Sequence, residues 1–117
     1  LDALLDREWK LVALHESDEI IRPKTGRKHT LNLDRKGKVT GWNDCNRYFG
    51  SFKLEKGNWL KFGKGFGSTL MLCMPGSLDF EFFESLKTSK GFEVDGDKLK
   101  LYYGDNAEYW MEFREND

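Results

Sequence analysis

Apolar and polar residues alternate with a period of two along most of this chain, and this alternation restricts the fold more than any other feature of the sequence. Successive side chains of a strand point to opposite faces, so a period of two is typical of strands with one buried face. The pattern runs through residues 28–41, 52–62 and 91–113. Turn sequences interrupt it at residues 34–37, 56–57, 95–96 and 104–106. We therefore expect about eight short antiparallel strands joined by tight turns.

A period of four occurs once, over residues 77–88. Leu78, Phe82 and Leu86 recur every fourth residue, which places them on one stripe of a helix. Ser77 precedes this stripe, and serine side chains commonly cap helix N-termini. The sequence therefore predicts one helix, whose apolar stripe lies against the sheet or plugs one end of a barrel.

Together these patterns predict an all-β fold with one short helix, an antiparallel meander curled into a small β-barrel or half-barrel. Such curling removes or protects the edges of the sheet. A chain of 117 residues is expected to form a single domain over residues 1–117. Its nine Phe, four Tyr and four Trp residues favour an interior filled by the protein's own side chains.

Three further segments carry specific predictions. Residues 9–14 are apolar at most positions and are predicted to form a first strand buried on both faces. The polar residues 15–28 are expected to form a surface loop, either a solvated connection or a recognition loop. Residues 68–73 follow three closely spaced glycines and are predicted to form another strand.

Charge disfavours two classes of partner. Nineteen basic and twenty acidic residues leave a formal charge of −1, so the chain has no global basic field to attract nucleic acid or anionic lipid. No apolar run is long enough for a membrane helix or a signal-peptide core. The chain starts at Leu1, and we expect that a leader was trimmed or that the chain is a fragment of a larger protein.

The two cysteines, Cys45 and Cys73, leave two alternatives open. They can form one disulfide across a long loop, or remain two buried thiols in a reducing compartment. Nucleophilic catalysis would need one of them as a thiolate beside a base, and the bases available are His15 and His29. His29 lies on a strand pattern and is interpreted as a core or rim histidine. The spacings typical of a zinc site are absent, so no metal site is expected.

Other candidate chemistries are also better explained by structure. Asp79, Glu81 and Glu84 could supply a carboxylate pair for glycoside hydrolysis, but they lie in the predicted helix, where capping and solubility account for them. The glycine-rich residues 63–69 lack the order of a phosphate-binding loop and precede a predicted strand. We therefore expect no catalytic residues and no cofactor.

Three tryptophans, Trp42, Trp59 and Trp110, lie out of phase with the apolar faces of their predicted strands. This phase places three large rings on the exterior, where exposed aromatic side chains mark binding surfaces. Either they form a partner surface, or the helix, the N-terminal segment or another chain covers them.

Four motifs resemble those of the META domain family, the domain of HslJ-like bacterial heat-inducible proteins. Residues 41–52, GWNDCNRYFGSF, resemble its GCNxYxGxY segment, with Asp44 in place of Gly. Residues 67–73 resemble its STRMAC segment, with Leu70 in place of Arg. Residues 79–86 and 95–101 resemble its ExxFxxxL helix and GDxLxL hairpin. The matching positions in the first two motifs are Asn46, Tyr48, Gly50, Ser68, Thr69 and Met71.

This resemblance spans roughly residues 8–114 and implies a lipocalin-like β-barrel with a disulfide between Cys45 and Cys73. It also implies a bacterial envelope location, periplasmic or lipoprotein-anchored, and a role in stress resistance. We accordingly expect a monomeric, non-enzymatic domain, in the envelope or secreted, that binds a protein or envelope partner and neither binds nucleic acid nor spans a membrane. A carrier of a small apolar ligand and a protease inhibitor are the alternatives.

Overall fold

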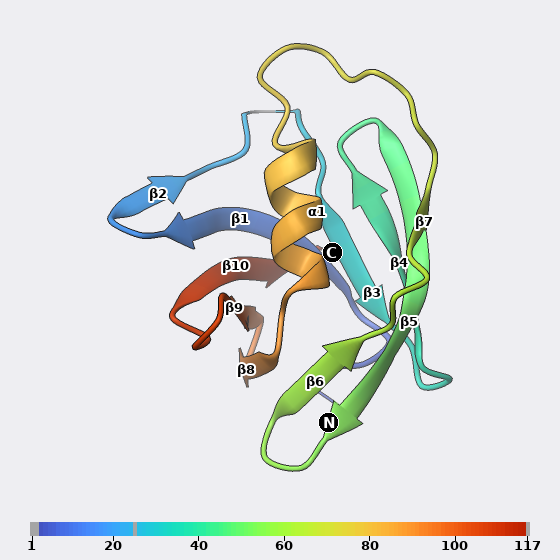
Figure 1. Cartoon of the computed structure of the whole chain (residues 1–117), viewed down its shortest axis with the longest axis vertical. Helices are drawn as coiled ribbons and strands as arrows, with labels where there is room; N and C mark the ends of the chain where they lie inside the picture. The colour runs from blue at the N-terminus through green and yellow to red at the C-terminus, as the bar shows by residue number, and fades with distance from the viewer. Residues whose placement is uncertain (1–2, 25, 117) are drawn as a thin grey trace.

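The computed structural model describes residues 3–24 and 26–116 and contains ten strands and one helix in these ranges (Figure 1). The first five strands are β1 (Glu8–Glu16), β2 (Glu19–Ile21), β3 (Thr30–Leu33), β4 (Lys38–Asn43) and β5 (Asn46–Glu55). The others are β6 (Trp59–Phe62), β7 (Gly67–Ser68), β8 (Gly91–Asp95), β9 (Lys98–Tyr103) and β10 (Tyr109–Glu115), with helix α1 (Asp79–Lys87) between β7 and β8.

Eight of the strands close into an antiparallel barrel, so the predicted fold class is confirmed. Neighbouring strands follow the order β1, β3, β4, β5, β6, β8, β9, β10, and β10 pairs with β1 to complete the ring. The short strands β2 and β7 pair with β1 and β5 outside this ring. The connections are short between most neighbours, as expected of a meander.

Helix α1 crosses the barrel and closes one end of it (Figure 1). Its Phe82 and Leu86 side chains are fully buried, and the Phe82 ring contacts Tyr48 and Phe113 in the barrel interior. The backbone N–H of the first helical residue donates to Ser77 Oγ over 3.1 Å. The predicted helix and its plugging role are therefore confirmed, with the helix one or two residues shorter at each end.

The barrel interior is filled by large side chains from nearly every strand. Trp9, Tyr48, Phe82 and Phe113 are among the largest buried side chains, and leucines and one methionine pack around them. This packing agrees with the filled interior expected from the aromatic content.

Three predicted segments differ from the structure. Strand β1 is not buried on both faces throughout, because Lys10 is exposed and a register shift between Leu11 and Ala13 interrupts the alternation. Residues 15–28 are not one loop, since β1 continues to Glu16 and β2 pairs back onto it. Of the strand predicted at 68–73, only Ser68 belongs to a strand.

Candidate functional site

The corner between β4 and β5 is a two-residue turn formed by Asp44 and Cys45. Asp44 has a φ of 57°, in the left-handed region that aspartate tolerates better than most residues. Its backbone N–H donates to Lys28 O over 2.6 Å, and its carboxylate pairs with Arg27. The Arg27 guanidinium also donates to Pro75 O over 2.9 Å, so one side chain joins three segments of the chain.

A disulfide joins Cys45 in this corner to Cys73, as expected from the family resemblance. The cysteines are 28 positions apart, and their Cα atoms are separated by 5.6 Å. The bond consumes both thiols, so neither cysteine is a thiolate nucleophile in this state. It attaches residues 69–78, which we call the apical loop, to the end of the barrel.

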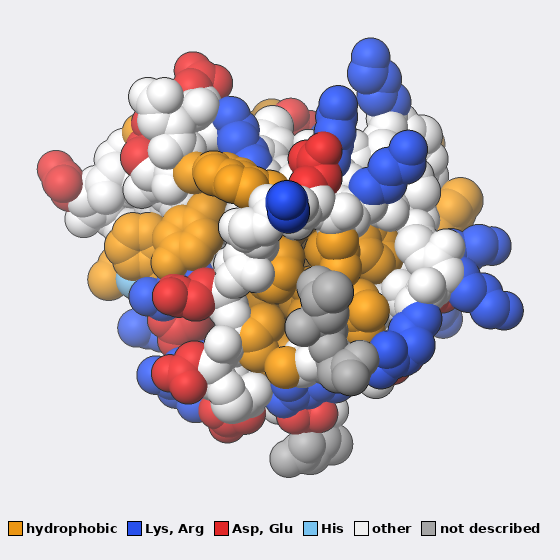
Figure 2. All heavy atoms as spheres, turned by 90° about the horizontal axis from the view of Figure 1, so that it is seen from below, with side chains coloured by type: hydrophobic (Ala, Val, Ile, Leu, Met, Phe, Trp, Pro, Cys, Tyr) orange, Lys and Arg blue, Asp and Glu red, His pale blue; other side chains and the backbone are white. Residues whose placement is uncertain are grey.

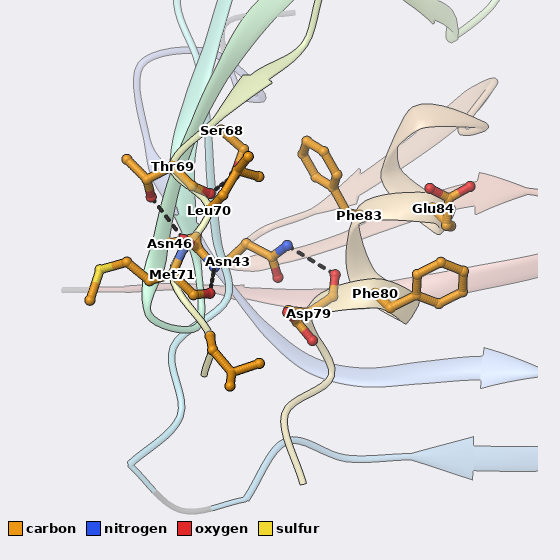
Figure 3. A pocket seen from close by; sticks show the side chains of 11 residues that line it. Asn43, Asn46, Ser68, Thr69, Leu70, Met71, Asp79, Phe80, Phe83 and Glu84 are labelled. Carbon is orange, nitrogen blue, oxygen red and sulfur yellow. Dashed lines mark hydrogen bonds between the residues drawn. The ribbon is translucent and has the colours of Figure 1, made fainter. Parts of the chain in front are cut away.

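Asn46 holds the apical loop along a second line of contact (Figure 3). Its Nδ2 donates to Met71 O over 2.9 Å, and its Oδ1 accepts from Met71 N over 2.7 Å and from Thr69 Oγ1 over 2.9 Å. Thr69 N in turn donates to Arg47 O over 3.0 Å. The side chain of a buried asparagine therefore makes the hydrogen bonds that hold the loop. In a sheet, the backbone of a neighbouring strand would make such bonds.

The clamped loop presents large apolar side chains to solvent. In Figure 1 it is the yellow segment at the top, which extends beyond the ends of the strands. Its exposed apolar side chains, and that of Phe80 at the start of α1, have these exposed fractions: Leu70 93%, Met71 63%, Leu72 100%, Met74 73% and Phe80 71%. Exposed apolar groups gathered in one region of a folded domain indicate a binding surface.

A cleft of about 330 Å³ separates this loop from α1 (Figure 3). Asn43 lies in the cleft wall, 5% exposed, and its Nδ2 donates to Asp79 O over 2.9 Å. Asn43 Oδ1 is buried and has no hydrogen-bond partner among the described residues. The cleft is lined by Asn43, Asn46, Ser68, Thr69, Leu70, Met71, Leu72, Asp79, Phe80, Phe83 and Glu84.

The six family-motif residues divide into two groups. Asn46, Ser68, Thr69 and Met71 line the cleft, whereas Tyr48 and Gly50 support the barrel. The Tyr48 ring is buried and its hydroxyl donates to the backbone carbonyl of β3; burial raises the pKa of this hydroxyl well above its usual value. A Cβ added at Gly50 would lie 2.8 Å from an aromatic ring, so the strand needs glycine there.

The three tryptophans proposed as a partner surface are not brought together. They lie on β4, β6 and β10, and no ring contact joins any two of them within residues 3–24 and 26–116. Trp42 is half-buried between the cations of Lys28 and Arg47, and Trp110 is half-buried under His15. Only Trp59, with 49% of its surface exposed, is largely open to solvent.

Trp59 borders a second cleft, of about 390 Å³, between β6 and the end of α1. The lower face of the molecule also brings apolar atoms to the surface, between scattered charged side chains of both signs (Figure 2). No buried polar atom without a partner belongs to a residue that lines this second cleft, among those described. The cleft at the apical loop therefore remains the stronger candidate.

The titratable groups considered for catalysis lie apart or are occupied. His29 is 1% exposed, and burial lowers its pKa to about 4, so the ring is neutral at physiological pH. Glu84 pairs with Lys87 over 2.9 Å on the helix surface. Within the part of the chain that the structure describes, no group of three or more His, Cys, Asp or Glu side chains is placed to hold a metal ion.

Comparison with known families gives one match, which covers nearly the whole chain, from residue 2 to residue 116. The matching family is that of the META domain. The chain belongs to the META domain family. No curated protein matches it in sequence.

Solved structures similar to this META domain include a protein from Burkholderia xenovorans determined by NMR, with 28% identity and a TM-score of 0.78 over 98% of this chain and 85% of that one. A DUF4847 family protein from Bacteroides vulgatus ATCC 8482 has 11% identity and a TM-score of 0.68 over 98% of this chain and 96% of that one. The second likeness shows the fold alone.

Two observations bear on where this META domain resides. Family membership and the disulfide are together consistent with a location outside the cytoplasm. Among the described residues, no helix has the length and apolar character needed to cross a membrane.

The alternation of apolar and polar residues does not predict the exposed side chains of the META domain's apical loop. The sequence predicts a strand at residues 68–73, in which Leu70 and Leu72, two positions apart, lie on the same face. The available signal was the apolar run Leu70–Leu72 directly before a cysteine and a Pro-Gly pair. A short apolar run of this kind is compatible with a buried strand and with an exposed apolar loop, because the local sequence does not show which segments pack against it.

Proposed function

We propose that this META domain is a non-enzymatic binding module of the bacterial envelope that docks a partner on the apical loop and the start of α1. The observation that carries the proposal is the exposure of four large apolar side chains on a loop held by a disulfide and by Asn46, and of Phe80 at the adjacent start of α1. The finer assignments, a periplasmic or lipoprotein-anchored location and a role in stress resistance, rest on family resemblance alone.

The energetics support a docking role for this surface. Burying a leucine or methionine side chain that was exposed contributes roughly 1.5–3 kcal/mol. Binding also costs the ordering of flexible loops. Because the disulfide and the Asn46 hydrogen bonds hold the loop beforehand, much of that ordering cost is already met during folding.

The packed interior argues against the alternative of a carrier with its ligand inside the barrel. A carrier needs an enclosed cavity of a few hundred cubic ångströms. Here Trp9, Tyr48, Phe82 and Phe113 fill the space between the strands. No observation favours a protease inhibitor over a binding module of another kind.

Site-specific photo-crosslinking tests the proposal. A benzophenone amino acid at position 72, which is fully exposed in the loop, should yield a covalent adduct when the protein is mixed with an envelope extract of the bacterium that encodes it. The same group at Lys61, exposed on the β6 strand, is the matched control and should yield none. Equal labelling at both positions, or no adduct at position 72, would refute a docking role for the loop.

A further inference from the structure

We propose that the cleft between the apical loop and α1 takes an extended peptide segment of a partner protein, added as a strand beside Leu70–Leu72. The segment would carry alternating apolar side chains and at least one Lys or Arg. This inference rests on the proposed function and specifies the partner of the same surface.

The first support is an unpaired backbone edge. The backbone groups on one side of this stretch are hydrogen-bonded. Thr69 N donates to Arg47 O, and the N–H and C=O of Met71 both bond to the side chain of Asn46. In an extended chain, the backbone groups of neighbouring residues point to opposite sides. The N–H and C=O groups of Leu70 and Leu72 have no hydrogen-bond partner among the residues described.

An edge of this kind is a template for strand addition. Backbone hydrogen bonds supply affinity in that mode of recognition, and pockets for alternate side chains supply specificity. The cleft provides the space beside the edge, with α1 as its far wall (Figure 3). Because Leu70, Leu72, Phe80 and Phe83 line this space, we infer that the side chains entering it are apolar.

The polar groups of the cleft that lack a partner among the described residues are an acceptor and a negative charge. Asn43 Oδ1 is buried at the cleft without a partner, so it can accept a hydrogen bond from an N–H donor. The Asp79 carboxylate, in the cleft wall, forms no ion pair or hydrogen bond with any described residue. Nearby Arg27 is already paired with Asp44. A Lys or Arg of the incoming segment would therefore complement the cleft.

The same charges argue against an anionic membrane as the occupant. The helix beside the loop begins with two acidic residues, Asp79 and Glu81, which would be repelled by a negative lipid surface. The unpaired backbone groups of Leu70 and Leu72 would also lose their water on insertion into the apolar part of a bilayer. A second copy of the chain could pair with the same edge, and the experiment includes that outcome.

Selection from a phage-displayed library of random dodecapeptides tests the proposal with the intact, oxidised protein as bait. The expected result is enrichment of peptides in which apolar residues alternate with others and at least one Lys or Arg is present. A synthetic copy of the best peptide should slow hydrogen exchange at the amides of Leu70 and Leu72. Methylating the backbone nitrogens on the pairing side of that peptide should weaken its binding about ten-fold or more, because the ladder bonds are lost.

Surface variants locate the binding site without disturbing the core. Leu72→Asn and Asp79→Asn should each weaken peptide binding about ten-fold, through the lost apolar contact and the lost charge-assisted bond. Ile20→Asn and Asp105→Asn make the same changes at exposed residues that do not line the cleft, and they should bind as the wild type does. A folded Leu72→Asn variant that binds the peptide normally would overturn the assignment.

Other outcomes also overturn the inference and leave the proposed function standing. These are enrichment of acidic peptides, exchange protection away from the cleft, protection of Leu70 and Leu72 by self-association in the free protein, or binding to phosphatidylglycerol vesicles together with failure of the selection. In each case, a crosslink at position 72 would still show that the loop docks a partner, but one of a different kind. The absence of any such crosslink would reject both.

Discussion

Asn46 pairs with the apical loop through its side chain much as one strand pairs with another. Its amide offers a donor and an acceptor to the N–H and C=O of Met71, and Thr69 Oγ1 adds a third bond. The side chain is 6% exposed, so these groups are not bonded to bulk water. Asn46 thereby satisfies backbone groups of the loop that have no partner within the sheet.

Replacing Asn46 with Ala should therefore lower the free energy of unfolding by about 1–3 kcal/mol, because backbone groups of Met71 lose their partners. Urea denaturation measures the loss. Asn106→Ala changes an exposed asparagine whose side chain makes no hydrogen bond among the described residues, and it should leave stability within about 0.5 kcal/mol of wild type. An unchanged urea midpoint for Asn46→Ala, together with lost partner binding, would make Asn46 a contact residue instead.

His29 makes the stability of the protein depend on pH. Its ring is buried against Phe82, and both ring nitrogens lack partners among the described residues. Burial is the main cause that lowers its pKa, and Arg27 adds to it, while Asp44 and Asp79 act in the opposite direction. The result is a folded-state pKa of about 4, against an ordinary value of 6.5.

Because the folded state binds the proton more weakly than the unfolded chain, the contribution of His29 is fully present above pH 6.5. It should fall as the pH drops from 6.5 to about 4, by about 3 kcal/mol in total. His29→Leu cannot titrate, so the stability of wild type relative to this variant should decrease over that interval. Urea denaturation at several pH values measures the difference. A difference that is flat with pH would contradict the assigned cause.

At the scale of the element, α1 has two phenylalanines with opposite environments. Phe82 is fully buried at the barrel end, where its ring contacts His29, Tyr48 and Phe113, whereas Phe80 is 71% exposed. Phe82→Ala should cost about 3–5 kcal/mol through lost burial and a residual cavity. Phe80→Ala should change stability by no more than about 0.5 kcal/mol. Thermal unfolding of both variants separates the helix's role as a plug from its role as a surface.

The disulfide anchors the apical loop to the β4–β5 corner. Removing it with Cys45→Ser and Cys73→Ser together should lower stability by about 3–4 kcal/mol, since the unfolded chain regains the freedom of a closed loop 28 positions long. Denaturant titration of the double variant against the oxidised wild type measures the loss. A much smaller loss would mean that Asn46 and Arg27 hold the loop without help from the bond.

At the scale of the whole molecule, the seams between neighbouring barrel strands differ in strength, and the one between β6 and β8 is a weak seam. Strands β1 and β10 pair over six residue pairs, while β6 and β8 pair only through Trp59 and Gly91. Two backbone bonds, Leu60 N to Lys90 O and Phe92 N to Asn58 O, extend the weak seam. Fewer bonds across a seam make local opening easier.

We expect the amides of Leu60 and Phe92 to exchange with deuterium at least about ten-fold faster than those of Met111 and Phe113 on β10. Native-state hydrogen exchange followed by NMR gives the rate of each amide. Equal protection on both sides would mean that the barrel opens only by global unfolding. Faster exchange on β10 would reverse the assignment of the two seams.

The amino-acid sequence by itself determined most strands of the barrel, the helix and the order of the meander. These depend on the local period of apolar residues and on turn residues such as those at 95–96, whose effects act within a few positions of the chain. It also determined the position of the helix plug, since Phe82 and Leu86 recur at helical spacing. The disulfide between Cys45 and Cys73 could be predicted only with the family resemblance, because the presence of two cysteines is equally compatible with two free thiols.

Only the tertiary structure decided which apolar residues remain exposed. Leu31 and Leu72 are both apolar residues in stretches that the sequence predicts to be strands, but the first is fully buried and the second is fully exposed. The difference arises because β3 has neighbours on both sides within the barrel, whereas residues 70–72 are bonded to Asn46 through Met71 and border the open cleft. Burial depends on which segments, distant in the chain, pack together, and no local period encodes that.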